Sequence, residues 1–190
     1  MVTSVRLFGA FLAVLYLERL AELLLSRRNA RIARERGGVE VGRRHYAAMV
    51  AVHAVFPAAC GAEVILLHRP FPGPIGIAAL GLALAAQALR WWAVATLGWR
   101  WNTRVVVAPG LAPVTGGPYR FLRHPNYLAV LVEAAAVPLI HGAWVCAVAF
   151  LAANAVLLAV RVPAEERALG PDYAAAFGGH RRFVPGARRG

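Results

Sequence analysis

The hydrophobic residues of this chain are gathered into five apolar segments separated by polar stretches. The segments cover residues 5–25, 46–67, 74–97, 126–140 and 143–160. A helix that crosses a bilayer needs about 20 residues at a rise of about 1.5 Å each, so the first three segments are long enough and the last two are short. Only His141 and Gly142 separate the last two, which predicts a tight helical hairpin. The pattern predicts an all-α integral membrane protein with five transmembrane helices, the last two extended by flanking residues.

The composition indicates a bilayer rather than water as the surrounding solvent. Hydrophobic residues make up 59% of the 190 residues, more than an ordinary soluble domain carries. The formal net charge of +12 could suggest nucleic acid, but a nucleic-acid-binding protein needs a solvated basic face, and apolar stretches fill most of this chain. We expect no nucleic-acid partner. Cys60 and Cys146 lie inside apolar segments and fit neither a metal-ligand nor a disulfide pattern, so we also expect no metal.

Arginine residues are concentrated in alternate polar segments. They follow the first, third and fifth apolar segments, whereas the opposite side keeps only Arg6 and Arg69. Because positive charge is retained on the cytoplasmic side, this predicts an outside N-terminus and a cytoplasmic C-terminus. We expect a multi-pass protein of the inner cell membrane whose site for a water-soluble cofactor faces the cytoplasm.

The polar connection after the third apolar segment, residues 98–123, should be a folded loop. Its Pro and Gly residues break regular elements, while its tryptophans and valines are too apolar to stay solvated. We expect one domain, residues 1–190. Within it, residues 1–97 should form a three-helix part for membrane and substrate, and residues 98–190 the cofactor-binding, catalytic part, with this loop and the C-terminal tail forming the cofactor site.

Several ionisable residues lie inside the apolar segments, where each is costly and therefore a functional candidate. Glu18, Arg19 and Glu22 in the first segment suggest a local ion pair whose side chains extend toward the interface. Glu63 lies near the outer end of the second segment, where water can reach it.

Glu133 is placed in the middle of the fourth apolar segment. A buried carboxylate there must be protonated or paired. Two interpretations remain open, a structural partner for Arg90 or Asn154 and a group of the substrate site.

Two polar clusters flank the predicted hairpin on the same side of the membrane. The first covers residues 117–127, and the second runs from Arg161 to Glu165 and Glu166. Pro163 should break or kink the helix between Arg161 and Glu165 of the second cluster. Because the clusters lie at the two cytoplasmic ends of one hairpin, their His, Arg, Tyr and carboxylate groups should converge.

The motifs of the C-terminal half form a specific set. They are Gly117-Pro118-Tyr119, Arg123-His124-Pro125-Asn126-Tyr127, Arg161 with Glu165 four residues on, Tyr173 and Phe183-Val184-Pro185. As a set they resemble the isoprenylcysteine carboxyl methyltransferase family of membrane enzymes. The Arg-His-Pro-x-Tyr element alone is less specific, because membrane sterol reductases and phospholipid methyltransferases carry similar signatures.

Further stretches resemble one bacterial branch of that family. They are residues 27–29, 45–46, 97–105, 124–127 and 161–169. Members of the branch lie beside type III polyketide synthases and methylate alkylpyrones or alkylresorcinols. This resemblance implies an O-methyltransferase for a lipophilic polyketide, with an isoprenylcysteine carboxyl methyltransferase as the alternative and a sterol-reductase-like oxidoreductase as a further one.

The resemblance also implies S-adenosylmethionine as the cofactor and a set of residues around it. Arg161 would face the substrate, Glu165 would bind a polar cofactor group, and Arg104 departs from the family pattern. The implied cofactor-binding residues are Ala112, Pro113, Val114, Tyr119, His124, Pro125, Asn126, Tyr127 and Glu165. The candidate catalytic residues are Arg161, Glu166 and Glu133, and His124 is a second candidate base beside Glu166.

The residue types in the two clusters suit this chemistry. S-adenosylmethionine needs a carboxylate for its ammonium group, donors for its carboxylate, and apolar or aromatic faces for adenine. Methyl transfer is an in-line displacement that depends on positioning and the exclusion of water. Arg161 could stabilise an anionic substrate oxygen. We expect a lipophilic small-molecule substrate arriving from the bilayer and no obligatory protein partner.

Overall fold

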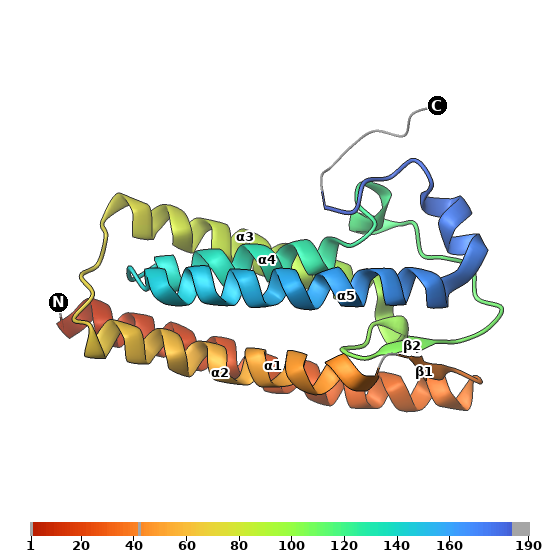
Figure 1. Cartoon of the computed structure of the whole chain (residues 1–190), viewed down its shortest axis with the longest axis horizontal. Helices are drawn as coiled ribbons and strands as arrows, with labels where there is room; N and C mark the ends of the chain where they lie inside the picture. The colour runs from red at the N-terminus through yellow and green to blue at the C-terminus, as the bar shows by residue number, and fades with distance from the viewer. Residues whose placement is uncertain (1, 42, 184–190) are drawn as a thin grey trace.

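The structure, a computed structural model, describes residues 2–41 and 43–183, without the side chains of residues 43–45. Five helices run side by side along one long axis, with α1 and α2 in one layer and α3, α4 and α5 in the other (Figure 1). They are α1 (Val2–Glu35), α2 (Arg43–Leu66), α3 (Pro74–Leu97), α4 (Pro125–Leu139) and α5 (Trp144–Phe177). The motif residues Val184 and Pro185, and the side chain of His45, lie outside the described part.

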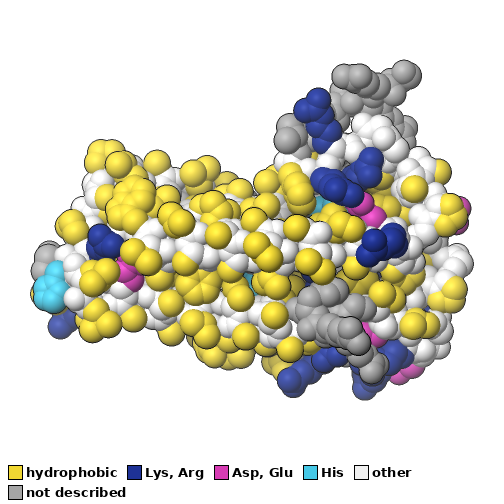
Figure 2. Space-filling model, viewed as in Figure 1, with side chains coloured by type: hydrophobic (Ala, Val, Ile, Leu, Met, Phe, Trp, Pro, Cys, Tyr) yellow, Lys and Arg dark blue, Asp and Glu magenta, His cyan; other side chains and the backbone are white. Residues whose placement is uncertain are grey.

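Among the described residues, three helices are long and apolar enough to cross a membrane, at Tyr46–Leu66, Pro74–Arg100 and Trp144–Phe177. The helix α4 is apolar but shorter, and α1 carries three charged residues in its middle. Hydrophobic side chains cover most of the visible surface along the bundle, whereas arginine side chains gather at the end that carries β1 and the bent end of α5 (Figure 2). The chain is a helical membrane protein, and five spans remain a prediction.

Helix ends follow local sequence signals. Pro74 and Pro125 each occupy the first turn of a helix, where the missing N–H would have no partner inside the helix. The helix α1 ends at Glu35 and is followed by Gly37, whose φ of 77° favours glycine. The Gly38 N–H closes this helix end by donating to the Ala33 carbonyl at 2.8 Å. The hairpin predicted at His141 and Gly142 is present between α4 and α5.

Of the break or kink predicted at Pro163, the break does not occur. The helix α5 continues through Pro163 and departs from helical geometry at Gly170, where φ is 76° and ψ is −168°. A proline removes one backbone hydrogen bond, and the buried Val162 beside it packs in a cluster with Tyr127 and Leu158 that holds the helix in place. Gly170 precedes Pro171, which disfavours helical geometry, and glycine alone adopts its backbone angles freely.

A two-stranded antiparallel sheet, absent from the sequence prediction, joins the two polar connections at one end of the bundle. The strand β1 (Val39–Val41) pairs with β2 (Val105–Val107), so that Glu40 lies opposite Val106. The Arg104 guanidinium donates to Glu40 at 2.7 Å, and this hydrogen bond raises the pKa of Arg104. The pairing fixes residues 98–123 against the end of α1, which confirms a folded loop.

Glu63 holds the start of α5 at the opposite end of the bundle. Its carboxylate accepts hydrogen bonds from the Val145 and Cys146 backbone N–H groups at 3.1 and 2.7 Å, and it pairs with Arg69 at 2.9 Å. The carboxylate therefore satisfies N–H groups that have no partner within the first helical turn. Glu63 is a structural cap rather than a carboxylate that water alone satisfies.

We expect Glu63→Gln to lower stability by about 1–3 kcal/mol, because the charge-assisted hydrogen bonds to the helix start are weakened. The midpoint of thermal unfolding in detergent measures the effect. Glu35→Gln is the matched control, since Glu35 is exposed and its pair with Arg31 is long at 3.9 Å. Equal midpoints for the two variants would show that Glu63 does not stabilise the helix start.

Candidate active site

A network of buried charges joins α1, α3 and α4 in the middle of the bundle. Arg90 donates two hydrogen bonds to Glu133, at 3.2 and 2.6 Å. Arg19 pairs with Glu22 at 2.9 Å and donates to Gln87 of α3 at 3.0 Å. The predicted local ion pair is present between Arg19 and Glu22, but its side chains are buried and join other helices instead of extending toward the interface.

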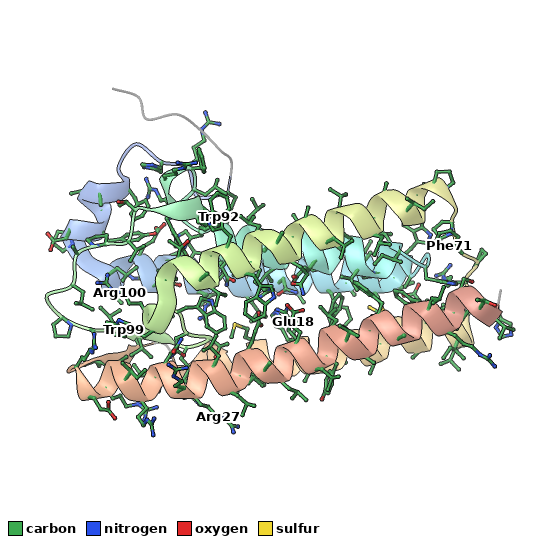
Figure 3. All side chains as sticks on the ribbon, turned by 180° about the vertical axis from the view of Figure 1, so that it is seen from behind. Glu18, Arg27, Phe71, Trp92, Trp99 and Arg100 are labelled. Atoms are coloured by element: carbon green, nitrogen blue, oxygen red, sulfur yellow. The ribbon has the colours of Figure 1, made fainter. Side chains whose placement is uncertain are left out.

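Glu18 belongs to the same network. It accepts hydrogen bonds from the Gln87 amide and the Trp91 indole N–H, and Figure 3 shows it between α1 and α3. Glu133 lies within this network with Arg90, as the structural interpretation of that residue expects.

Beside the network lies a cavity of about 160 Å³, here called the bundle cavity. Its walls come from all five helices and from residues 101–103, and most of its lining surface is apolar, with contributions from Leu20, Leu23, Val50 and Leu157. Its polar lining includes Arg19, Glu22, Arg90 and Arg161. Its volume is below the usual range of about 300–1,000 Å³ for small-molecule sites, so it can hold only part of a long lipophilic molecule. A mainly apolar lining surface with a few polar groups suits such a part.

A second, larger cavity of about 580 Å³ lies under the folded loop and is here called the loop cavity. Backbone and apolar side chains of residues 105–114 form one wall, and Tyr119, His124, Glu165 and Tyr173 form another. Its volume is within the usual range of about 300–1,000 Å³ for cofactor sites.

The two cavities meet at a common wall. Four residues line both of them: Trp101, Asn102, Asn126 and Tyr127. The Asn126 side-chain oxygen is buried there and has no hydrogen-bond partner among the described residues. The two cavities are therefore adjacent at these four side chains, and groups bound in them would come closest there.

A hydrogen-bonded chain crosses the same wall. The Arg161 Nε donates to the Tyr127 hydroxyl at 2.6 Å, and the Tyr127 hydroxyl donates to Glu165. Arg161 lines the bundle cavity and Glu165 lines the loop cavity. Tyr127 thus lies between Arg161, which lines the bundle cavity, and Glu165, which lines the loop cavity.

The Arg161 side chain is held by several hydrogen bonds but still has unused N–H donors. Its guanidinium also donates to the Thr103 carbonyl at 2.6 Å and to the Met49 sulfur at 3.3 Å. Three of the five N–H donors of an arginine are then in use, so N–H groups remain for a ligand in the bundle cavity.

Glu166 and His124 form a different cluster, which contacts the described part of the C-terminal tail at Arg181 and Arg182. The Glu166 carboxylate accepts from Arg182 at 3.0 and 2.5 Å and lies 3.0 Å from the His124 Nε2. The Arg123 and His124 backbone N–H groups donate to the Arg181 and Arg182 carbonyls, each at 3.2 Å. The described tail therefore packs on the turn that precedes α4.

The comparisons with known proteins identify the family of this chain. The isoprenylcysteine carboxyl methyltransferase (ICMT) family matches residues 79–171, which contain most of the loop-cavity lining. The uncharacterized protein YpbQ of Bacillus subtilis (strain 168) is 38% identical over 164 residues, which cover 86% of this chain and 96% of that protein. The chain belongs to the ICMT family. It is therefore a methyltransferase of the membrane.

Most of the predicted cofactor residues of this ICMT-family protein are brought together. The loop cavity is lined by Ala112, Pro113, Val114, Tyr119, His124, Asn126, Tyr127 and Glu165. Pro125 is fully buried at the start of α4, where it positions its neighbours. Burial raises the pKa of Tyr119, which keeps its hydroxyl neutral beside the cavity.

The three candidate catalytic residues are separated. Arg161 lines the bundle cavity, Glu166 pairs with the tail, and Glu133 pairs with Arg90. His124 does line the loop cavity, but it stacks on Tyr127 with ring centroids 5.4 Å apart. Of the candidates, Arg161 is therefore the one placed to meet a lipophilic substrate at the common wall.

The structure adds site residues that the sequence did not single out. Trp101 and Asn102 belong to the common wall, and Asp172 lines the loop cavity. The signal available for Trp101 was an aromatic residue in a loop too apolar to be solvated. Asp172 has no such signal, because a carboxylate after a Gly-Pro pair is also typical of an exposed helix start.

The loop cavity fits the chemical groups of S-adenosylmethionine. Glu165 and Asp172 offer carboxylates for an ammonium group, and Arg100 and Arg123 offer donors for a carboxylate. Aromatic faces for adenine come from Trp99, Tyr119 and Tyr173 in the same lining. The buried, unpartnered oxygen of Asn126 is a further polar atom at the wall.

Proposed function

We propose that this methyltransferase uses S-adenosylmethionine to methylate an oxygen of a lipophilic acceptor that enters from the bilayer. The observation that carries the proposal is the common wall between an apolar cavity within the bundle and a polar cavity under the loop. One cavity suits a lipid-like acceptor and the other a water-soluble cofactor. The active site would open to the cytoplasm.

When bound in the loop cavity, S-adenosylmethionine would supply an electrophilic methyl group. Glu165 would hold its ammonium group, and Tyr119 and Tyr173 would pack on its apolar parts. Arg161 would hold the acceptor oxygen in its anionic form, since guanidinium N–H groups aimed at the developing reaction centre act strongly where water is excluded. Trp101 and Tyr127 would exclude water from the wall.

Catalysis in this proposal is positional and electrostatic. Arg161 stabilises the deprotonated acceptor, so a carboxylate needs no base, while a phenol must lose its proton. His124 is the candidate base at the loop cavity, and the pairing of Glu166 with Arg182 favours a structural role for that carboxylate.

The family match supports a carboxyl acceptor, as in isoprenylcysteine, better than a phenolic one. An alkylresorcinol or alkylpyrone acceptor rests on the sequence resemblance alone and stays a prediction. Both acceptors combine a long apolar part with an oxygen that can be anionic, which is the combination that the bundle cavity and Arg161 suit.

The experiment is a binding and transfer assay on the purified protein in detergent. We expect retention of S-adenosylmethionine and of its demethylated product, no retention of a nicotinamide dinucleotide, and methyl transfer to a lipophilic acceptor. A prenylcysteine and a long-chain resorcinol are offered in parallel to rank the two acceptor classes. Retention of the nicotinamide cofactor alone would favour a reductase and reject the proposal.

The proposed orientation predicts which chain segments can be labelled from the cytoplasm. Glu35→Cys, Gly116→Cys and Gly179→Cys each expose a thiol at the end of the bundle that carries the loop cavity. We expect an impermeant thiol reagent to label all three in inverted vesicles and none in intact cells. Leu67→Cys, at the other end, should show the opposite pattern, and the parent chain with its buried Cys60 and Cys146 measures the background. Labelling of any of the first three in intact cells would reverse the orientation.

A further inference from the structure

The bundle cavity contains polar groups that methyl transfer at the common wall does not use. Glu22 is 4% exposed and lines the cavity, yet its Oε1 has no hydrogen-bond partner among the described residues. Its other oxygen pairs with Arg19, while the nearest cation to Oε1, the Arg90 Nη1, is 3.6 Å away and beyond hydrogen-bond distance. A buried carboxylate oxygen without a partner is costly, so a donor is expected there.

A donor group without a partner lies on the same helix face, one turn away. Arg19 lines the bundle cavity, and its buried Nε–H has no hydrogen-bond partner in the described chain. Residues three apart on a helix are neighbours, so one ligand group can reach both atoms. That group must donate to Glu22 and accept from Arg19. A hydroxyl does both, whereas an ammonium group only donates.

The charges around the cavity also disfavour a cationic group. The lining contains three guanidinium groups, on Arg19, Arg90 and Arg161, and one carboxylate, on Glu22. A cationic ligand would meet a like charge on several sides. The carboxylates of Glu18 and Glu133 do not line the bundle cavity and are already engaged with α3.

We infer that the acceptor carries a hydroxyl group distinct from the oxygen that is methylated, and that this hydroxyl binds between Glu22 and Arg19. The inference rests on the proposed function, because it takes the bundle cavity as the acceptor site. It makes Glu22 a specificity-determining residue.

The test measures binding, so that it does not depend on turnover. A long-chain resorcinol, with two ring hydroxyls, is compared with the matching alkylphenol, with one, by titration of the detergent-solubilised protein in the presence of the demethylated cofactor. We expect the parent protein to bind the resorcinol about tenfold more tightly. Glu22→Gln should reduce the ratio of the two affinities to near one. The neutral amide oxygen accepts the hydrogen bond of the second hydroxyl more weakly than the carboxylate does.

Glu18→Gln is the matched control. It removes the same charge from the same network, but Glu18 does not line the bundle cavity, so the preference for the resorcinol should persist. A third probe, with an aminomethyl group in place of the second hydroxyl, should bind no better than the alkylphenol.

Each other outcome overturns the inference. These outcomes are no preference in the parent protein, a preference that survives in Glu22→Gln, equal loss in Glu18→Gln, tighter binding of the amine, and no binding of the resorcinol. Failure of the proposed function is seen separately, as absence of cofactor binding and of methyl transfer to any lipophilic acceptor. The two failures are therefore distinguishable.

Discussion

Arg161→Lys should lower methyl transfer by about 100-fold while leaving the affinity for the cofactor nearly unchanged. The guanidinium lines the bundle cavity and is separated from the loop cavity by Tyr127. Lysine keeps the charge but loses the planar set of donors that binds Thr103 and Tyr127 and faces the acceptor at the same time. Single-turnover methyl transfer and calorimetry with the demethylated cofactor, on the same preparation, measure the two quantities.

Arg167→Lys is the control for this variant, since Arg167 is an exposed residue of the same helix. It should change neither quantity. A parallel loss of cofactor affinity and turnover in Arg161→Lys would show that Arg161 supports the cofactor site, and its assignment to the acceptor would be wrong.

Glu165→Gln should have the opposite signature. Glu165 lines the loop cavity, and its carboxylate accepts from Tyr127. Under the proposed function, neutralising this carboxylate removes a charge-assisted hydrogen bond to the cofactor ammonium group. We expect a loss of about 1–3 kcal/mol in cofactor binding, or roughly 5- to 150-fold in Kd. Calorimetric titration with S-adenosylmethionine and with its demethylated product gives the value directly.

The adjacent carboxylate provides the comparison for Glu165. Glu166→Gln should lower the midpoint of thermal unfolding, because the Glu166 carboxylate binds Arg182 and His124. Its effect on cofactor affinity should be smaller than that of Glu165→Gln. If Glu166→Gln weakened the cofactor more than Glu165→Gln, the assignment of the two carboxylates would have to be exchanged.

The main features of the fold could be predicted because each depends on local sequence. The boundaries of α3 follow from Pro74 and the apolar run after it, and the turn at His141 and Gly142 follows from the gap between two apolar segments. The sheet was not predictable, since β1 and β2 have three residues each and are far apart in the chain. The continuation of α5 through Pro163 was missed because tertiary packing of Val162 outweighs the local effect of proline.

The candidate site was predictable in composition but not in arrangement. Motif residues such as Tyr119 and Glu165 do line one cavity, as the convergence of the two clusters predicts. Glu22 was interpreted through its neighbours in sequence, whereas its surroundings include α3 and the bundle cavity. The contact between Arg90 and Glu133 joins residues 43 positions apart, and no periodicity distinguishes it from a contact with Asn154.

The central claim is that the protein methylates a lipophilic acceptor from the bilayer. The transfer of a labelled methyl group from S-adenosylmethionine to a lipid measures it most directly. The purified protein is incubated with methyl-labelled S-adenosylmethionine and a lipid extract of its own membranes, and the solvent-extractable label is counted. We predict that label appears in a lipophilic product with the parent protein and is strongly reduced with Arg161→Lys and with Glu165→Gln. Label that stays in the aqueous phase with the parent protein, although the cofactor binds, would contradict methylation of a bilayer-derived acceptor.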